Sequence, residues 1–570
     1  MDLVRTIIRL IPVFHYPEGR WLVAGLFLGS LLDLISLATL FPLLLLVTDG
    51  NSDWIQQIPI GFQADRTRLG IGIVIAFLLL TVVKAGYYQW ITQKKAAYAY
   101  RVGASIAHTQ MQHFFALQYQ QYSSKDYSNE MNRLSNLPLV FANNAIVPAG
   151  TLLTEVLFFG FLLLAVALFD YLALLMVIGV VLPALWLYSL RKKAIKETSE
   201  QIKSDYPRLL KATLQMVEGW RDIKVFHREG FFIDQFLTQF KKLGNIFSRD
   251  HALHTATARL AEVVAAACIT VLIVYALIFS ASTHETLLLF GVYAAVAFRA
   301  IPSVSRILAA HHQIQSHQHV LNQLEEVAKP SSPEKSDMAV GFEHDLRISN
   351  LCFSYGSHLV CDHVSFHIRK GELVLLQGKS GTGKTTLALL LSGMLPASNG
   401  NILIDGVALN QSNITAWKRM VAYVPQEPFL LDASIAENIA FGLPPNDMDH
   451  VVIDQIMKSL DLQPWVNGLP QRTKTVIGER GIKVSGGQRQ RLVIGRALYH
   501  KANLLLLDEI TNQLDSQTQA EVVAVLKHLT KQGLTVVMIS HQMADRSKFD
   551  SVLEFRDGKV TVAQTAMPHS

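Results

Sequence analysis

Six long apolar segments limit the folds open to the first 310 residues of this chain. A helix needs roughly 20 apolar residues to cross the hydrocarbon of a bilayer, because each residue adds only about 1.5 Å. Segments of this length lie near residues 21–48, 69–90, 143–169, 171–190, 260–280 and 286–310, with Asp170 alone between the third and the fourth. The sequence therefore predicts a domain of six transmembrane helices over residues 21–325.

Basic residues indicate how this domain lies in the membrane. Loop 91–142 carries five Lys and Arg residues and loop 191–259 carries fourteen, whereas loop 49–68 carries two. Because Lys and Arg accumulate on the cytoplasmic side, we expect both long loops and both termini to be cytoplasmic. The long loops are amphipathic, so helices two to five are expected to continue well beyond the bilayer.

The net charge of +6 follows from these basic loops, and we expect no nucleic-acid partner. Residues 1–20 carry three arginines among apolar positions but lack the short apolar core and cleavage site of a signal peptide, which favours an interfacial elbow helix. The three cysteines, Cys268, Cys352 and Cys361, have no metal-ligand spacing and are expected to be free thiols.

A second domain is predicted after a linker. Residues 326–343 are rich in Pro, Ser and charge, as linkers are. From there to residue 570, short β-type runs at 373–376, 504–507 and 535–539 alternate with helical patterns. This layout is typical of an α/β domain with a largely parallel sheet.

The strongest single motif of the second domain is a glycine-rich loop. It follows the apolar run 373–376 and precedes a helical pattern, so bare backbone N–H groups and a helix N-terminus would face phosphate. Lys384 would pair with the β- and γ-phosphates of ATP, and Thr385 would ligate Mg²⁺. The residues expected to bind the nucleotide here are Gly378, Lys379, Ser380, Gly381, Thr382, Gly383, Lys384, Thr385 and Thr386.

The buried run at 504–507 ends in two carboxylates. Asp508 is placed to hold Mg²⁺ through water, and Glu509 to polarise the attacking water as a general base. Taken alone, an acidic strand end is equally compatible with a solvated or capping role.

Residues 484–491, Val-Ser-Gly-Gly-Gln-Arg-Gln-Arg, resemble the signature motif of the ABC transporters. The resemblance implies that Ser485, Gly486, Gly487 and Gln488 bind the γ-phosphate of an ATP molecule held by a second subunit. Val484 departs from the usual leucine of the motif, which leaves the phosphate-facing residues unchanged.

Other positions match the same family in the same order along the chain. The resemblance implies that Tyr355 stacks on adenine, that Gln426 reaches Mg²⁺ and the attacking water, and that His541 contacts the γ-phosphate. It also implies that Asp515 crosses the dimer interface. The segment 475–481, with Glu479, resembles a motif of exporters, which argues against an importer.

The membrane half resembles bacterial lipid-linked oligosaccharide flippases through the segments 119–133, 222–232 and 298–306. The resemblance implies coupling helices in the first two segments and a bacterial cytoplasmic (inner) membrane. Charged residues inside spans are costly and are therefore functional candidates, namely Asp33, Lys84, Glu155, Glu262, Arg299 and Arg306.

Arg299 and Arg306 are the candidate substrate residues, because two guanidinium groups lining a cavity would hold an anionic group. The alternatives are internal pairing, for example of Asp33 with Lys84, and snorkelling of Arg306 toward the cytoplasm. The histidine-rich run 311–319 suggests metal, but a polar, solvated helix is the favoured interpretation.

Together these features predict an exporter-type half-transporter that hydrolyses ATP and alternates access across the bilayer. A homodimer is favoured, since one chain carries every residue of the composite site, although a heterodimer stays open. The first choice of substrate is a lipid-linked saccharide or another amphipathic envelope precursor. A small peptide or toxic compound is the second choice, and an ATP-gated channel or a regulator is a third.

Overall fold

The computed structural model describes residues 17–39, 42, 66–279, 283–327, 338–478, 484–510, 516–541 and 545–563. The chain divides into two compact units. The helical unit comprises Met1–Leu117 and Ser124–Ser331, and the sheet unit comprises Gln118–Ser123 and Ser332–Ser570. The short segment Gln118–Ser123 lies in the sequence between two helices of the helical unit, but it belongs to the sheet unit. The predicted elbow helix lies almost entirely outside the described residues, as does most of the predicted linker.

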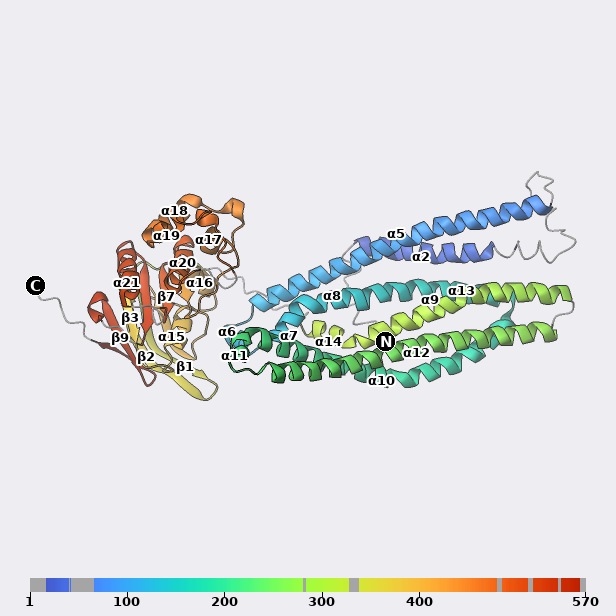
Figure 1. The fold of residues 1–570 in the computed structure, drawn as a ribbon, viewed down its shortest axis with the longest axis horizontal. Coiled ribbons are helices and arrows are strands. Elements are labelled where there is room, and N and C mark those ends of the chain that lie inside the picture. Colours follow the sequence, from blue (N-terminus) through green and yellow to red (C-terminus); the bar gives the residue numbers. More distant parts are fainter. Residues whose placement is uncertain are drawn as a thin grey trace, which may run out of the picture. The chain divides into compact units, whose positions relative to one another are not determined.

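The helical unit is a bundle of long helices that run alongside one another (Figure 1). Its elements are α2 (Pro17–Ala38), α5 (Arg66–Phe115), α7 (Tyr127–Met131), η1 (Asn132–Asn136), α8 (Leu137–Phe141), η2 (Ala142–Ile146), α9 (Val147–Phe169), α10 (Tyr171–Glu218), α11 (Trp220–Val225), α12 (Glu229–Phe279), α13 (Thr283–Ser316) and α14 (Gln318–Val327).

Four helical stretches of the described chain are long and apolar enough to cross a membrane, namely Glu18–Ala38, Gly70–Phe115, Tyr127–Leu168 and Phe290–Ser316. Two shorter apolar stretches, Tyr171–Pro183 and Glu262–Ile278, fall on the predicted fourth and fifth spans. The apolar helical domain is thus confirmed, whereas the number of six spans stays a prediction.

Several helices are far longer than a bilayer is thick. The 50 residues of α5 extend for roughly 75 Å, more than twice the hydrocarbon thickness. The predicted turn at Asp170 is also present, since this residue alone separates α9 from α10. Its carboxylate accepts hydrogen bonds from Leu172 N (3.0 Å) and Ala173 N (3.1 Å), which satisfies the free N–H groups at the start of α10.

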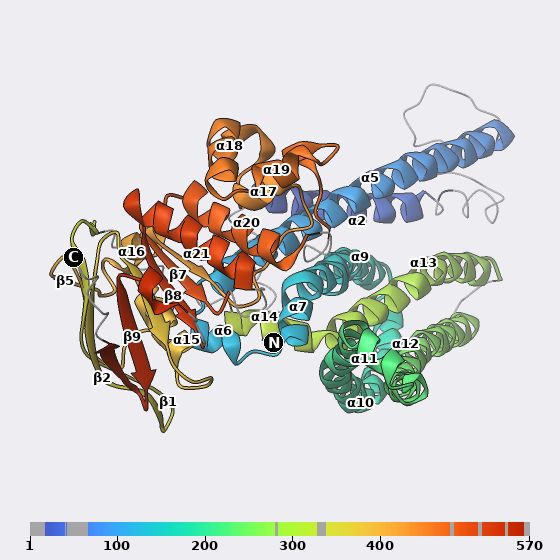
Figure 2. The same cartoon turned by 60° about the vertical axis from the view of Figure 1, so that its left-hand side comes forward.

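The sheet unit contains the predicted α/β layout (Figure 2). Its helices are α6 (Tyr119–Ser123), α15 (Lys384–Leu391), α16 (Ile414–Met420), α17 (Ile435–Ile439), α18 (His450–Ser459), α19 (Gln463–Asn467), α20 (Gly486–Tyr499) and α21 (Ser516–Lys531). Its strands are β1 (Asp345–Tyr355), β2 (His358–Arg369), β3 (Leu373–Gln377), β4 (Asn399–Ile404), β5 (Val407–Ala408), β6 (Val421–Val424), β7 (Leu504–Asp508), β8 (Thr535–Ser540), β9 (Ser551–Arg556) and β10 (Lys559–Ala563).

The strands form two sheets. An antiparallel sheet has the order β2-β1-β4-β5, and a six-stranded sheet has the order β10-β9-β3-β8-β7-β6. In the larger sheet β3, β8, β7 and β6 are mutually parallel. The three strands predicted from apolar runs, β3, β7 and β8, are neighbours in its centre, as continuous apolar runs buried on both faces predict.

Alternate residues of these strands enter two different cores. Leu373, Leu375, Leu505 and Leu507 pack in one cluster with residues of α17, α18, α20 and α21. Val374, Leu376, Leu504 and Leu506 pack in the other cluster with α15 and the antiparallel sheet. The strand period of two therefore covers both faces of the large sheet.

The packed part of the sheet unit begins a few residues before the predicted boundary at 344. Phe342 is 1% exposed and packs edge-on against Trp417, with ring centroids 5.8 Å apart. Trp417 is itself fully buried, and its indole N–H donates to Leu391 O at 2.8 Å. The composition of the predicted linker, 326–343, gave no sign that Phe342 near its C-terminal end is packed in the core of the sheet unit.

Replacing Trp417 by Ala is expected to lower the free energy of unfolding by about 3–5 kcal/mol, because a fully buried indole leaves a cavity. Thermal unfolding of the purified full-length protein measures this change. Val451→Ala on α18 is the control, since Val451 is 67% exposed. Equal melting temperatures for the two variants would contradict the assigned role of Trp417.

Candidate nucleotide site and membrane cavity

The predicted phosphate loop, Gly378–Thr385, connects β3 to the first turn of α15. Two of its positions require glycine. A Cβ at Gly378 would lie 2.4 Å from Phe555 O, and Gly383 has φ +113° with Val360 Cγ1 2.5 Å from an added Cβ. The two glycines allow the loop backbone to pass close to its neighbours on its way to the N-terminus of α15. The backbone N–H groups at a helix N-terminus can bind an anion.

Lys384 reaches back over the loop from the start of α15. Its ammonium group donates to Gly378 O at 2.9 Å and to Lys379 O at 2.7 Å, and the residue is 3% exposed. Burial lowers the pKa of Lys384, while the nearby carboxylates of Glu509 and Asp508 act in the opposite direction. The two carboxylates favour the charged form of Lys384, and an ammonium group can donate charge-assisted hydrogen bonds to phosphate oxygens.

The carboxyl ends of the parallel strands meet beside this loop. Gln377 is paired with Ser540, and Asp508 with Ile539. The last residues of β3, β8 and β7 therefore lie at the same edge of the sheet. The next residues are Gly378, His541 and Glu509. The structure therefore brings together three of the motifs that the sequence analysis singled out separately.

Glu509, His541 and Lys384 lie in contact. The Nε2 atom of His541 contacts Glu509 Oε1, its Nδ1 atom lies 3.2 Å from Gly378 O, and Lys384 Nζ is 3.7 Å from Glu509 Oε1. Glu509 adopts φ +52°, a left-handed conformation that is costly for a residue with a side chain. Its N–H donates to Ile539 O at 3.1 Å, which helps to hold this conformation.

Asp508 has the surroundings expected of a residue that binds a metal ion. The residue is 4% exposed and its Oδ1 atom is buried without a hydrogen-bond partner among the described residues, while Tyr423 donates to the other oxygen, Oδ2, at 3.0 Å. An unsatisfied buried carboxylate oxygen is costly and suits Mg²⁺ or a water bound to it. Thr385, the other predicted Mg²⁺ ligand on the loop, is exposed at the first turn of α15.

Two further predicted residues are exposed on the sheet unit. Gln426 follows β6, two residues after its last position, and Tyr355 ends β1 with 41% of its surface exposed. The ring of Tyr355 packs edge-on against Phe353, with centroids 4.9 Å apart. An accessible aromatic face is available for a base to stack on.

The signature residues form the start of α20. Ser485 and Gln488 make a reciprocal capping box, with Ser485 N donating to Gln488 Oε1 (3.0 Å) and Gln488 N donating to Ser485 Oγ (3.3 Å). Gly486 is exposed and Gly487 partly so. Such a helix N-terminus is open to an anion from outside the unit. Asp515 and Glu479 lie outside the described residues.

The membrane charges are paired. Lys84 lies 3.3 Å from Asp33, as the internal-pairing alternative predicts, and Arg299 also contacts the Asp33 carboxylate. Arg306 forms an ion pair of 2.5 Å with Glu155. These contacts join α2, α5, α9 and α13 through buried carboxylates. Glu262 is different, since it pairs with Arg259 on the exposed surface of α12.

These charged side chains surround a cavity of about 430 Å³. Its lining contains four basic residues, Lys84, Lys95, Arg299 and Arg306, but only two acidic ones, Asp33 and Glu155. Lys95 donates to Thr151 Oγ1 at 2.8 Å, and no ion pair to it occurs in the part of the chain that the structure describes. The predicted arginines thus share one polar cavity that has an excess of positive charge.

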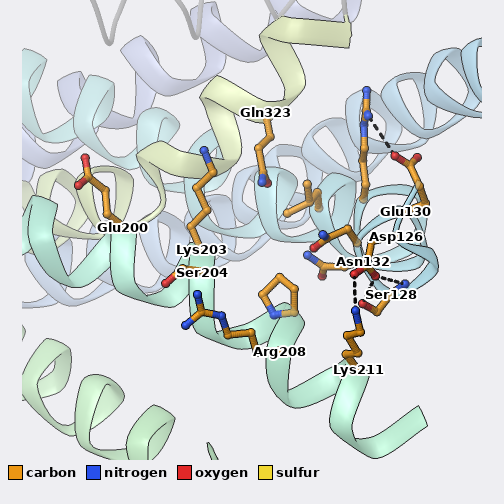
Figure 3. A pocket seen from close by; sticks show the side chains of 14 residues that line it. Asp126, Ser128, Glu130, Asn132, Glu200, Lys203, Ser204, Arg208, Lys211 and Gln323 are labelled. Carbon is orange, nitrogen blue, oxygen red and sulfur yellow. Dashed lines mark hydrogen bonds and ion pairs between the residues drawn. The ribbon is translucent and has the colours of Figure 1, made fainter. Parts of the chain in front are cut away.

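A larger open cavity of about 600 Å³ lies between α7, η1, α10 and α14 and contains none of the predicted site residues (Figure 3). Lys211 of α10 pairs with Asp126 at 3.1 Å, and Arg133 pairs with Glu130 at 3.4 Å. Most of the charged side chains of this cavity are well exposed. The cavity is therefore a solvated crevice whose walls are joined by ion pairs.

The histidine-rich run 311–319 is not the solvated helix that we expected. His312 is 2% exposed, and Ser316 beside it donates to Asp250 Oδ1 at 2.9 Å. His317 contacts Asn144 and His319 contacts Ser199. The apolar residues Ile314 and Val320 lie in the bundle core and carry the polar ones inward, where hydrogen bonds satisfy part of their polar atoms.

Comparison with known proteins agrees with this geometry. Residues 361–512 match the family model described as ABC transporter. The chain is similar to the ATP-dependent lipid A-core flippases of Burkholderia orbicola (27% identical over 392 residues) and of Burkholderia pseudomallei strain 1710b (28% over 400 residues), in each case over 68% of this chain and 65% of the relative. The flippase of Ralstonia nicotianae is 37% identical over 224 residues, which are 39% of this chain and 38% of that protein.

The fold has a close counterpart among solved structures. A bacterial Atm1-family ABC exporter with ATP bound superposes with a TM-score of 0.78 at 19% identity, over 95% of this chain and 94% of the other. Residues 361–512 are thus similar to the ABC transporter family, and the chain has the fold of this solved exporter, in which an apolar helical domain is fused to a sheet-containing domain. The sequence matches span less than two thirds of the length of the first flippase relatives.

Lys384→Ala is expected to weaken ATP binding by about tenfold to a hundredfold, because it removes a buried charged donor from the phosphate loop. Equilibrium binding of a fluorescent ATP analogue to the purified protein measures this affinity. Lys531→Ala, at the exposed end of α21, serves as the control. An unchanged affinity in Lys384→Ala would reject the role assigned to that residue.

Proposed function

We propose that this chain is an ATP-hydrolysing exporter of the flippase type, which moves an amphipathic substrate outward across a bacterial cytoplasmic membrane. The observation that carries the proposal is the convergence of Lys384, Glu509 and His541 on one phosphate loop, in a chain that also has an exporter's membrane domain. The names of the relatives, ATP-dependent lipid A-core flippase, support ATP dependence and the class of substrate.

In the ATPase domain, the phosphate loop would hold the β- and γ-phosphates and Lys384 would neutralise their charge. Glu509 would accept a proton from the attacking water, with His541 keeping its carboxylate oriented. Thr385, Asp508 and Gln426 would hold Mg²⁺, which neutralises charge on the phosphates when bound. Tyr355 would stack on adenine.

A second copy of the chain would complete each nucleotide site. Ser485 and Gln488 bond to each other at the N-terminus of α20, and Gly486 beside them is exposed. Two such half-sites in a C₂ dimer would place one chain's signature residues against the ATP held by the other. Binding of ATP to the closed pair better than to the open pair would then drive the change in the membrane domain.

The charged cavity of the membrane domain supports an anionic head group on the substrate. Arg299 and Arg306 line it, and its basic residues outnumber its acidic ones by two. Arg299 also lies over the ring of Phe158 at 4.5 Å, so its guanidinium has an apolar side as well as a charged edge. A phosphate or carboxylate on a lipid-like molecule fits both features, which favours a lipid-linked saccharide or a similar envelope precursor.

Export of a small peptide or toxic compound is the second candidate, and an ATP-gated channel or a regulator the third. The intact set of Lys384, Glu509 and His541 speaks against a channel or regulator, which would have no need of an assembled hydrolytic site. The excess positive charge of the cavity speaks against a basic peptide.

Glu509→Gln is expected to reduce ATP turnover by roughly 10²–10⁴-fold while ATP binding is kept, because only the proton-accepting carboxylate is lost. The variant is also expected to stay as a closed, ATP-bound dimer. Phosphate release and nucleotide binding by the purified protein measure the two effects. Phosphate release at the wild-type rate would exclude Glu509 as the base.

Arg299→Ala is expected to abolish the stimulation of ATP hydrolysis by an anionic lipid-linked saccharide, while the unstimulated rate stays near that of the wild type. Hydrolysis in liposomes, with the saccharide lipid, a neutral lipid and a peptide as test compounds, measures the difference. Glu262→Ala, at an exposed pair on α12, is the control. Stimulation by the peptide alone would favour the second candidate.

A further inference from the structure

Tyr423 is a half-buried phenol at the edge of the nucleotide site. It lies on β6, whose register places it opposite Leu506 of β7, two residues before Asp508. Its hydroxyl donates to Asp508 Oδ2 at 3.0 Å. The adjacent strand therefore reaches across and fixes one oxygen of the carboxylate that ends β7.

The two oxygens of Asp508 are not equivalent. Tyr423 satisfies Oδ2, whereas Oδ1 is buried and has no hydrogen-bond partner in the part of the chain that the structure describes. A carboxylate held at one oxygen cannot turn freely, so its other oxygen keeps a constant direction. Buried unsatisfied oxygens are costly, and a cation or a cation-bound water at Oδ1 would relieve that cost.

The direction of this hydrogen bond follows from the two groups. A phenol O–H is a donor, whereas a carboxylate oxygen accepts. Three residues further along the chain is Gln426, the residue that we expect to approach Mg²⁺ from the loop after this strand.

We propose that Tyr423 is a positioning residue for Mg²⁺: by holding Oδ2 of Asp508, it aims Oδ1 at the metal ion that accompanies ATP. The inference rests on the proposed function of this site as a Mg·ATP site. It adds a residue for which the motif comparison gave no role.

The test uses Tyr423→Phe in the full-length protein, which keeps the ring and removes only the hydroxyl. The affinity for a fluorescent ATP analogue is measured in EDTA and over a range of Mg²⁺ concentrations. We expect unchanged affinity in EDTA and a Mg²⁺ concentration for half-maximal tightening that rises by roughly tenfold, as loss of a group that orients a metal ligand typically gives.

Two controls accompany the measurement. Tyr499→Phe removes another tyrosine hydroxyl of the same domain, the one that accepts a hydrogen bond from Asp449 N at 2.9 Å, and should leave the Mg²⁺ dependence unchanged. In an Asp508→Asn background, Tyr423→Phe should add little, because its effect acts through the carboxylate.

The outcomes separate the two claims. Wild-type protein that binds no ATP would overturn the proposed function itself. Wild-type binding that tightens with Mg²⁺, together with an unchanged Mg²⁺ requirement in Tyr423→Phe, would overturn only the role of Tyr423. Weaker binding in EDTA by the same factor as in Mg²⁺ would also overturn it, since that result shows a general disturbance of the site.

Discussion

Burial of the Lys384 ammonium group beside acidic strand ends is the interaction on which the nucleotide site depends. The charge lies 3% exposed, held by two carbonyl oxygens of its own loop. That arrangement exists only because β3, β8 and β7 are parallel and end in step, which places Gly378, His541 and Glu509 at one edge of the sheet. The strand segments 373–376, 504–507 and 535–539 are buried on both faces, which places them in the centre of the sheet.

The position of the phosphate loop between a strand and a helix could be predicted from the sequence because it depends on local patterns. An apolar strand followed by a glycine loop and a helix predicts a phosphate site wherever it occurs, and the structure places Lys384 there as expected. Asp170 is a similar case in the membrane domain, since one polar residue between two apolar runs has to be a turn. In both cases neighbouring residues in the sequence carry the whole signal.

Contacts between distant residues were not predictable in the same way. The role of Tyr423 depends on β6 lying beside β7, a pairing that no local pattern encodes. Asp33 was expected to pair with Lys84, but its second partner, Arg299, comes from a helix 266 residues away. The burial of His312 was not predicted, because most residues around it in the sequence are polar. Its few apolar neighbours, such as Ile314, are the ones that pack in the bundle core.

The central claim is that each ATP lies between the phosphate loop of one chain and the signature residues of another. Its most direct test mixes two differently tagged chains, one with Lys384→Ala and one with Ser485→Arg, and isolates the mixed dimer. A site shared between chains leaves one intact pair, so the mixed dimer should retain about one ATP while each parent dimer retains none. A mixed dimer that retains no ATP would show that both residues act within a single chain, and would contradict the shared site.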